Sequence, residues 1–173
     1  MVSPHASRVL VTGGAGFIGS ELTTQLVAAG HEVVVLDNLS TGRWANIEGL
    51  PSERLILTIG DVRDRGAVAA AVHDVSIVFH LAVINLRHAL LHPRDAHDVN
   101  ATGTLNVLEA ARKAGVTRFV HVSSSEVYGS AVRPTMSEEH PTMPSTVYGA
   151  SKLAGEALAR AFSGTYGLSL IHI

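Results

Sequence analysis

The chain has 173 residues, of which 46% are hydrophobic and 16% are charged, and it carries a formal net charge of −2 and no cysteine. This composition predicts one globular domain with a sizeable core, argues against nucleic acid or an anionic membrane as a partner, and excludes disulfides, catalytic thiols and thiolate metal sites. No apolar run reaches membrane-spanning length and the N-terminus shows no secretory signal pattern, so we expect a cytoplasmic protein.

Short runs rich in β-branched residues alternate along the chain with longer helical patterns. In chain order these patterns predict a strand at 8–13, a helix at 17–30, strands at 31–37 and 55–60, a short helix at 64–73, a strand at 76–82, a helix at 95–115, a strand at 118–124 and a helix at 146–166. Near-continuous apolar strands separated by helices indicate an α/β fold whose parallel sheet is doubly wound and covered on both faces. The irregular stretches 38–53 and 129–145 are expected to be functional or mobile loops.

A glycine-rich loop, TGGAGFIG at 12–19, joins the first predicted strand to the first helix. Gly14, Gly16 and Gly19 fit the spacing G-x-G-x-x-G, and Gly13, Gly16 and Gly19 fit G-x-x-G-x-x-G. Glycine permits a tight turn and a close approach of the backbone to a pyrophosphate, while the helix N-terminus supplies free N–H groups. Because the loop follows a strand and opens a helix, it predicts a dinucleotide site rather than an ordinary turn.

Two acidic residues follow the next predicted strands. Asp37 comes 18 residues after Gly19, where a carboxylate can accept both ribose hydroxyls and repel the 2′-phosphate of NADP. This position favours NAD as the cofactor, although the nearby Arg43 leaves NADP as an alternative. The alternative role for Asp37 itself is to cap a loop. Asp61 and Val62 are candidates for adenine contacts, and a helix cap is the alternative for Asp61.

Tyr148 and Lys152 stand four residues apart, on one face of the predicted helix at 146–166. Tyrosine is ordinarily a poor base at neutral pH, but a neighbouring ammonium and a positively charged nicotinamide ring favour the phenolate. The pair alone is also compatible with a half-exposed helix face. Ser124 ends the strand at 118–124, at the sheet edge where open α/β sheets bind ligands, and a capped turn is its alternative interpretation.

Seven stretches occur together in one order: TGGAGFIG, DNLSTG, GDV, FHLA, VNATGTLNVLEAA, VSSSEVYG and YGASK. Together they resemble the NAD-dependent epimerase/dehydratase branch of the extended short-chain dehydrogenase/reductases, which acts on nucleotide sugars. The resemblance runs from about Arg8 to Gly167. It implies a Rossmann fold, bound NAD, hydride transfer at sugar C4 and a homodimer formed through the helices at 95–115 and 146–166.

The resemblance also implies roles for the matching residues. The cofactor contacts would be Gly13, Gly16, Phe17, Ile18 and Gly19 at the pyrophosphate, Asp37 and Asn38 at the adenosine ribose, Asp61 and Val62 at the adenine, and Leu81 and Ala82 along the cofactor. Asn100 would support the architecture beside the cofactor. Tyr148 would be the acid/base, Lys152 would grip the nicotinamide ribose and tune the tyrosine, and Ser124 would hold the substrate oxygen.

The sequence leaves open which enzyme of this branch the chain represents. DNLSTG and VNATGTLNVLEAA look most like UDP-glucose 4-epimerases, which act on a UDP-linked sugar. Dehydratases of the branch carry an Asp-Glu pair where this chain has Ser125 and Glu126, which argues against dehydration. A Ser-Glu pair is similar to UDP-glucuronate decarboxylases, in which the glutamate assists catalysis, although Glu126 could also be a solvated turn residue. A non-catalytic NAD-binding sensor or scaffold is the alternative from another class.

Three histidines, His88, His92 and His97, lie in the stretch RHALLHPRDAHD. The i, i+4 spacing of the first two permits joint metal ligation. Because Pro93 is expected to break the helix and the implied chemistry needs no metal, we expect no metal site and predict a mobile segment near the substrate pocket.

The stretch after the last predicted helix is GLSLIHI, enough for the start of a sixth strand. The resemblance therefore predicts a fragment, an incomplete Rossmann domain over 1–173 that lacks the C-terminal region gripping the nucleotide and sugar. Residues 168–173, LSLIHI, also match the translation of a transposase end sequence used in sequencing libraries, which suggests adapter-derived residues. An ordinary β-strand is the alternative interpretation.

Overall fold

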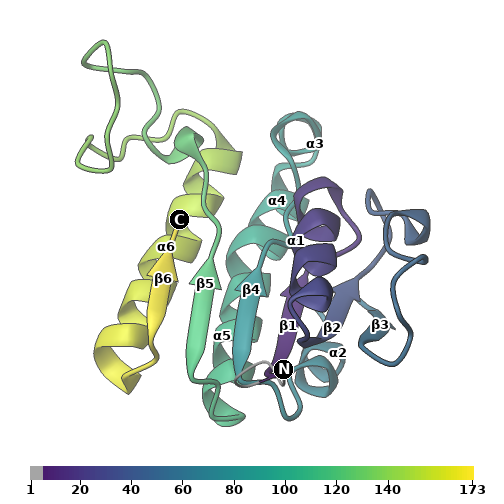
Figure 1. Cartoon of the computed structure of the whole chain (residues 1–173). Coiled ribbons are helices and arrows are strands. Elements are labelled where there is room, and N and C mark those ends of the chain that lie inside the picture. Colours follow the sequence, from purple (N-terminus) through teal and green to yellow (C-terminus); the bar gives the residue numbers. More distant parts are fainter. Residues whose placement is uncertain (1–5) are drawn as a thin grey trace.

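The computed structural model describes residues 6–173. The N-terminal stretch in which the sequence shows no secretory signal pattern begins with residues 1–5, which lie outside the described residues. Its centre is a six-stranded parallel sheet in the order β3-β2-β1-β4-β5-β6 (Figure 1). The strands are β1 (Arg8–Thr12), β2 (Glu32–Asp37), β3 (Leu55–Ile59), β4 (Ile77–His80), β5 (Arg118–His121) and β6 (Leu170–His172). The order reverses between β1 and β4, as in a doubly wound dinucleotide-binding sheet, so the predicted fold class is confirmed.

Six α-helices connect and flank these strands within the described residues. They are α1 (Phe17–Ala28), α2 (Arg65–Ala71), α3 (Leu86–Leu91), α4 (Pro93–His97), α5 (Thr104–Lys113) and α6 (Val147–Tyr166). Short 3-10 turns cover Trp44–Asn46 and Ser125–Val127, and a π-helical turn covers Asp98–Gly103 between α4 and α5.

Local sequence signals explain where the helices begin and end. The side chain of Asp64 caps α2 by accepting hydrogen bonds from the backbone N–H groups of its first turn, and Thr146 caps α6 by accepting one from Gly149. Gly167 ends α6 in a left-handed conformation with φ of 70°, which glycine adopts without steric cost. The Thr146 cap sets the start of α6, and therefore the position of the tyrosine and lysine in its first two turns.

Alternate strand residues face two separate apolar cores. On one face, valines of β1 and β2 pack with α1; these are Val9, Val11, Val33 and Val35. On the other face, the cluster draws on β1, β2, β4 and β5 together with α2, α5 and α6; its members include Leu10, Leu36, Val78, Leu108, Phe119 and Phe162. Burial on both faces accounts for the near-continuous apolar strands in the sequence.

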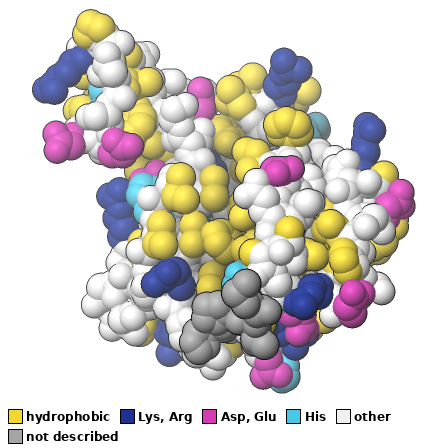
Figure 2. Space-filling view, in the orientation of Figure 1, with side chains coloured by type: hydrophobic (Ala, Val, Ile, Leu, Met, Phe, Trp, Pro, Cys, Tyr) yellow, Lys and Arg dark blue, Asp and Glu magenta, His cyan; other side chains and the backbone are white. Residues whose placement is uncertain are grey.

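The two faces are covered unequally. In Figure 1, α5 and α6 run behind β4, β5 and β6, whereas α1 lies in front of the sheet at β1. Figure 2 shows hydrophobic side chains gathered near the middle of the front face. Ile171 of β6 is 40% exposed. The predicted doubly wound sheet is confirmed: Ile77 and Phe79 of β4 still pack against the core on the α1 face and Val120 of β5 is buried, so among the described strands the cover of this face thins toward β6.

The segment between the 3-10 turn at Ser125–Val127 and α6 projects from the body of the domain as a long loop (Figure 1). Within residues 6–173, none of the helices combines the length and the apolar character that crossing a bilayer requires.

Candidate cofactor and active site

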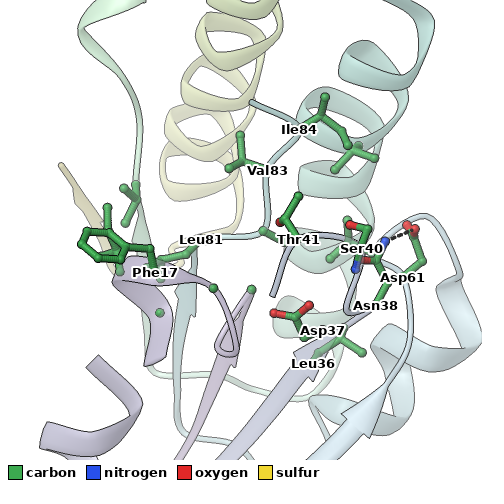
Figure 3. Close-up of a pocket in the computed structure, with 18 of the residues that line it drawn as sticks. Phe17, Leu36, Asp37, Asn38, Ser40, Thr41, Asp61, Leu81, Val83 and Ile84 are labelled. Carbon is green, nitrogen blue, oxygen red and sulfur yellow. Dashed lines mark hydrogen bonds between the residues drawn. The ribbon is translucent and has the colours of Figure 1, made fainter. Parts of the chain in front are cut away.

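A cavity of about 330 Å³ opens at the carboxyl edge of the sheet, where the strand order reverses. Open α/β sheets bind ligands at this position. Most of the residues assigned from the sequence line it: Gly13, Gly16, Phe17, Ile18, Gly19, Asp37, Asn38, Asp61, Val62, Leu81, Ala82, Tyr148 and Lys152. Figure 3 shows part of this lining, with Phe17 at one end of the cavity and Asp61 at the other.

The glycine turn has the shape that a pyrophosphate requires. Gly13 has φ of +70°, and a Cβ added to it would lie 2.9 Å from the backbone nitrogen of Ala82. A Cβ on Gly19 would collide with the carbonyl oxygen of Gly13. The N-cap of α1 is Gly16, which offers no capping side chain, so the first N–H groups of α1 stay open to an anion. The turn therefore fits the phosphates of a dinucleotide.

The carboxylate of Asp37 is held in place at the end of β2. One oxygen accepts a hydrogen bond from the backbone N–H of Ala15 at 3.0 Å and the other from that of Leu39 at 2.8 Å. Asp37 therefore caps this loop, as the alternative interpretation proposed. Each carboxylate oxygen has a second lone pair, so the same group retains capacity for ribose hydroxyls.

Asp61, at the far end of the cavity, forms a charged cluster with Arg63. The Nε and Nη2 atoms of Arg63 lie 2.9 and 2.8 Å from the two Asp61 oxygens, and Nδ2 of Asn38 donates at 2.9 Å. The hydrogen bond from Arg63 lowers the pKa of Asp61 to about 2. Asp61 is thus a fixed acceptor at the rim, and the helix-cap alternative is wrong because Asp64 caps α2.

A buried threonine of β1 fixes the loop that follows β4. Thr12 Oγ1 accepts hydrogen bonds from the backbone N–H groups of Leu81 and Ala82, both at 3.1 Å, and lies 2.8 Å from Nδ1 of His80. These contacts hold Leu81 and Ala82 against the glycine turn, where they line the cavity.

His80 completes this network as a neutral ring. Thr104 Oγ1 donates to the carbonyl oxygen of Asn100 at 2.7 Å and lies 2.9 Å from Nε2 of His80. Because the Thr104 proton is committed, Nε2 must be the donor, which leaves Nδ1 to accept the proton of Thr12. Burial, reinforced by the charge of Lys152, lowers the pKa of His80 to about 3.

Tyr148 and Lys152 enter the cavity from the start of α6. The Nζ of Lys152 donates to the carbonyl oxygen of Val122, just after β5, at 2.6 Å. Lys152 is 4% exposed, and burial lowers its pKa to about 8, partly opposed by the charge of Glu156. The structure therefore brings the phenol and the amine to the cavity that the glycine turn opens.

The serines after β5 take different positions. Ser123 lines the cavity, but its hydroxyl lies 2.5 Å from a carboxylate oxygen of Glu156. Ser124 is not among the lining residues; its Oγ accepts a hydrogen bond from the backbone N–H of Glu126 at 3.2 Å, so it caps the 3-10 turn. The hydrogen bonds of residues 6–173 leave the Ser124 proton free to donate.

Glu126 also lies outside the cavity lining. Its Oε2 is 3.4 Å from the hydroxyl of Thr146, the N-cap of α6. The carboxylate is thus turned toward the start of α6, where the positive end of the helix dipole favours a negative charge.

Asn100 supports the site from a buried position. Its Oδ1 accepts a hydrogen bond from the backbone N–H of Ile84 at 2.8 Å, and its Nδ2 donates to the Ile84 carbonyl at 3.1 Å and to Ser151 at 3.0 Å. Ser151 in turn donates to the carbonyl oxygen of Tyr148 at 2.7 Å. The π-helical turn therefore links the loop after β4 to the first turn of α6.

Sequence reasoning missed several lining residues, which are Leu36, Ser40, Thr41, Gly60, Val83, Ile84, Val99, Val122 and Ser123. Ser40 and Thr41 lie in the stretch DNLSTG, directly after Asp37, and their polar run was an available signal. Val83 and Ile84 are apolar residues beyond a strand end, a pattern that does not separate cavity lining from core.

The sheet order, the glycine turn and the carboxylate that ends β2 define a dinucleotide-binding α/β domain of the Rossmann class. The family model described as "NAD dependent epimerase/dehydratase family" matches residues 9–173. The chain belongs to this family.

Relatives of this chain include both 4-epimerases and 4,6-dehydratases of nucleotide sugars. The chain is 39% identical over 170 residues to a UDP-glucose 4-epimerase of Mycolicibacterium smegmatis, an alignment that covers 96% of this chain and 54% of the relative. It is 37% identical over 174 residues to a dTDP-glucose 4,6-dehydratase of Streptomyces niveus, covering 95% and 52%. The crystal structure of DesIV, a dTDP-glucose 4,6-dehydratase of Streptomyces venezuelae with NAD and TYD bound, superposes with a TM-score of 0.90 at 38% identity, covering 95% of this chain and 54% of that one. The chain thus spans about half the length of these relatives.

Proposed function

We propose that this chain is the NAD-binding part of a nucleotide-sugar 4-epimerase that acts on a UDP-linked sugar. The observation that carries the proposal is that Tyr148 and Lys152 line the same cavity as the glycine turn and Asp37. A domain that only binds a dinucleotide needs no phenol and buried amine at the nicotinamide end, so this pairing argues against a sensor or scaffold.

The cofactor, when bound, supplies a hydride acceptor and donor at sugar C4. The glycine turn and the N-terminus of α1 hold the pyrophosphate, and Asp37 holds the adenosine ribose. Tyr148 takes the proton of the C4 hydroxyl as C4 is oxidised, and returns it to the same oxygen after the keto sugar has presented its other face. Lys152 binds the nicotinamide ribose, and its positive charge stabilises the tyrosine phenolate.

Ser124 is proposed to hold the reacting oxygen. Its free proton can be donated to that oxygen, whereas the hydroxyl of Ser123 is engaged by Glu156. For this role the substrate oxygen must approach the end of β5 beside the cavity, since Ser124 borders the lining rather than forming part of it.

The choice of epimerisation over elimination or decarboxylation rests on two positions. Ser125, where dehydratases of the branch carry an aspartate, is exposed and offers no carboxylate. Glu126, which decarboxylases use, points toward Thr146 and outside the cavity lining. Decarboxylation remains the second candidate, because the contact that turns Glu126 toward Thr146 is 3.4 Å long and therefore weak.

The test assays the product of the complete gene against UDP-glucose and UDP-glucuronate. Inversion at C4 of UDP-glucose, without release of CO₂ from UDP-glucuronate, supports epimerisation; release of CO₂ supports decarboxylation. The variant Tyr148→Phe should lose at least about 100-fold in kcat, the usual contribution of acid–base catalysis, while retaining NAD binding. Unchanged turnover in this variant would overturn the mechanism.

A further inference from the structure

Three metal-ligating side chains converge where α3 meets α4. His88 and His92 come from α3 and its C-cap, and Asp95 comes from the first turn of α4. One candidate ligand atom from each lies within 4.8 Å of the other two. The Nε2 of His88 is 3.0 Å from Oδ2 of Asp95, and the rings of His88 and His92 have their centroids 4.6 Å apart.

The break at Pro93 assembles this cluster instead of dispersing it. As predicted, Pro93 ends one helix, since α3 stops at Leu91 and α4 begins at Pro93. The break, however, falls after His92, whose backbone N–H still donates to the carbonyl oxygen of His88 at 2.9 Å. The i, i+4 pair therefore keeps its helical register, and the turn at Pro93 brings Asp95 beside it. His97 is not part of the cluster.

The spacing and chemistry suit a divalent transition metal. Ligand atoms about 2.0–2.2 Å from a tetrahedral zinc ion lie roughly 3.3 Å from one another, so this cluster needs only modest side-chain rotation. Two imidazoles and a carboxylate form a donor set that zinc and its neighbours accept, with water completing the coordination.

The charges around the cluster are mixed, since Arg87 and Arg94 adjoin His88 and Asp95 in the chain and Asp98 adds a negative charge nearby. Arg63 lies close enough to Asp95 and Asp98 for their charges to raise its pKa, but it is engaged mainly by Asp61. All three ligand residues are at least partly exposed, so a metal ion can reach them without opening the core.

We propose that His88, His92 and Asp95 form a binding site for a divalent transition metal of the zinc class, which joins α3 to α4. The segment that the metal would hold together, α3 and α4, lies between Ile84 and Asn100 in the chain. Ile84 and Asn100 hydrogen-bond to each other beside the cofactor cavity. The metal would thus stiffen one wall of the cavity without entering the chemistry. This inference goes beyond the proposed function and contradicts our expectation, from the sequence, of no metal site.

The test titrates the tag-free 173-residue chain with Zn²⁺ in competition with a chromophoric chelator. We expect one tight site, and His88→Ala, His92→Ala and Asp95→Asn should each weaken it by at least about tenfold, the loss expected when one of three ligands is removed. Thermal melts without metal confirm that each variant folds, and Zn²⁺ should raise the melting temperature of the original chain more than that of these three variants.

Two control variants separate this site from general histidine binding. His73→Ala disrupts an exposed His–Asp pair with the same 3.0 Å separation but no second histidine, and His97→Ala removes a neighbour outside the cluster. Both should bind Zn²⁺ as the original chain does. Absence of a site tighter than about 100 μM, or equal losses in the controls and the cluster variants, would overturn the proposal.

Discussion

The Nζ of Lys152 donates a 2.6 Å hydrogen bond to the carbonyl oxygen of Val122, which joins the second turn of α6 to the end of β5. This contact fixes the amine at the cavity, although the side chain is almost completely buried. Because burial disfavours the ammonium, the pKa of Lys152 falls to about 8. The desolvation that brings the pKa of Lys152 close to neutral pH therefore also destabilises the folded state.

Replacement of Lys152 by methionine should change how stability depends on pH. An unfolded lysine keeps its proton up to about pH 10.5, whereas folded Lys152 loses it near pH 8. The unfolded state therefore binds more protons between these values, so the free energy of unfolding should rise with pH across this window by on the order of 3 kcal/mol relative to Lys152→Met. Urea unfolding at pH 7.5 and pH 10 measures the difference. Parallel pH profiles for the two proteins would contradict the buried-amine description.

Two buried histidines should make the domain sensitive to acid. Burial is the main cause that lowers the pKa of His80 to about 3 and that of His121 to about 2. Below about pH 6.5 the unfolded histidines take up protons and the folded ones do not, so stability falls as pH drops, by on the order of 2 kcal/mol per histidine at pH 5.

The variant His121→Phe isolates one of these contributions. Both ring nitrogens of His121 are buried without a hydrogen-bond partner among the described residues, so the replacement removes no such bond. The loss of stability between pH 7 and pH 5 should shrink by about the contribution of one histidine. His73→Phe, at an exposed site, should retain the full loss. A variant as acid-sensitive as the original chain would show that His121 titrates normally.

Asp37 should set the preference for NAD over NADP. In Asp37→Asn the amide oxygen can still accept one backbone hydrogen bond, but the negative charge that repels a 2′-phosphate is gone. We expect the ratio of the NADPH and NADH dissociation constants to fall by at least about tenfold. Asp61→Asn, at the other end of the cavity, should weaken both cofactors alike. Fluorescence titration measures all four affinities, and an unchanged ratio in Asp37→Asn would assign the preference elsewhere.

The sequence predicted the doubly wound parallel sheet and, together with the family resemblance, most of the cavity lining, because strand hydrophobicity, glycine spacing and polar strand ends are local signals. It did not predict the division of the helix at 95–115 into α4, the π-helical turn and α5, since the contacts of Asn100 with Ile84 and Ser151 stabilise that turn from other elements. Likewise, nothing local distinguishes Ser123 from Ser124. Their roles differ because Glu156, 33 residues beyond Ser123, engages only one of them.

The central claim is that the glycine turn holds the pyrophosphate of NAD across the sheet edge. Calorimetric titration of the 173-residue chain with NAD⁺ tests it most directly, using Gly19→Ala, whose Cβ would collide with Gly13, and the matched helix variant Gly164→Ala, whose Cβ meets open space. We predict one binding site in the original chain and in Gly164→Ala, and an affinity at least about tenfold weaker in Gly19→Ala with its fold intact by circular dichroism. Equal affinity in all three proteins, or no binding in the original chain, would contradict the claim.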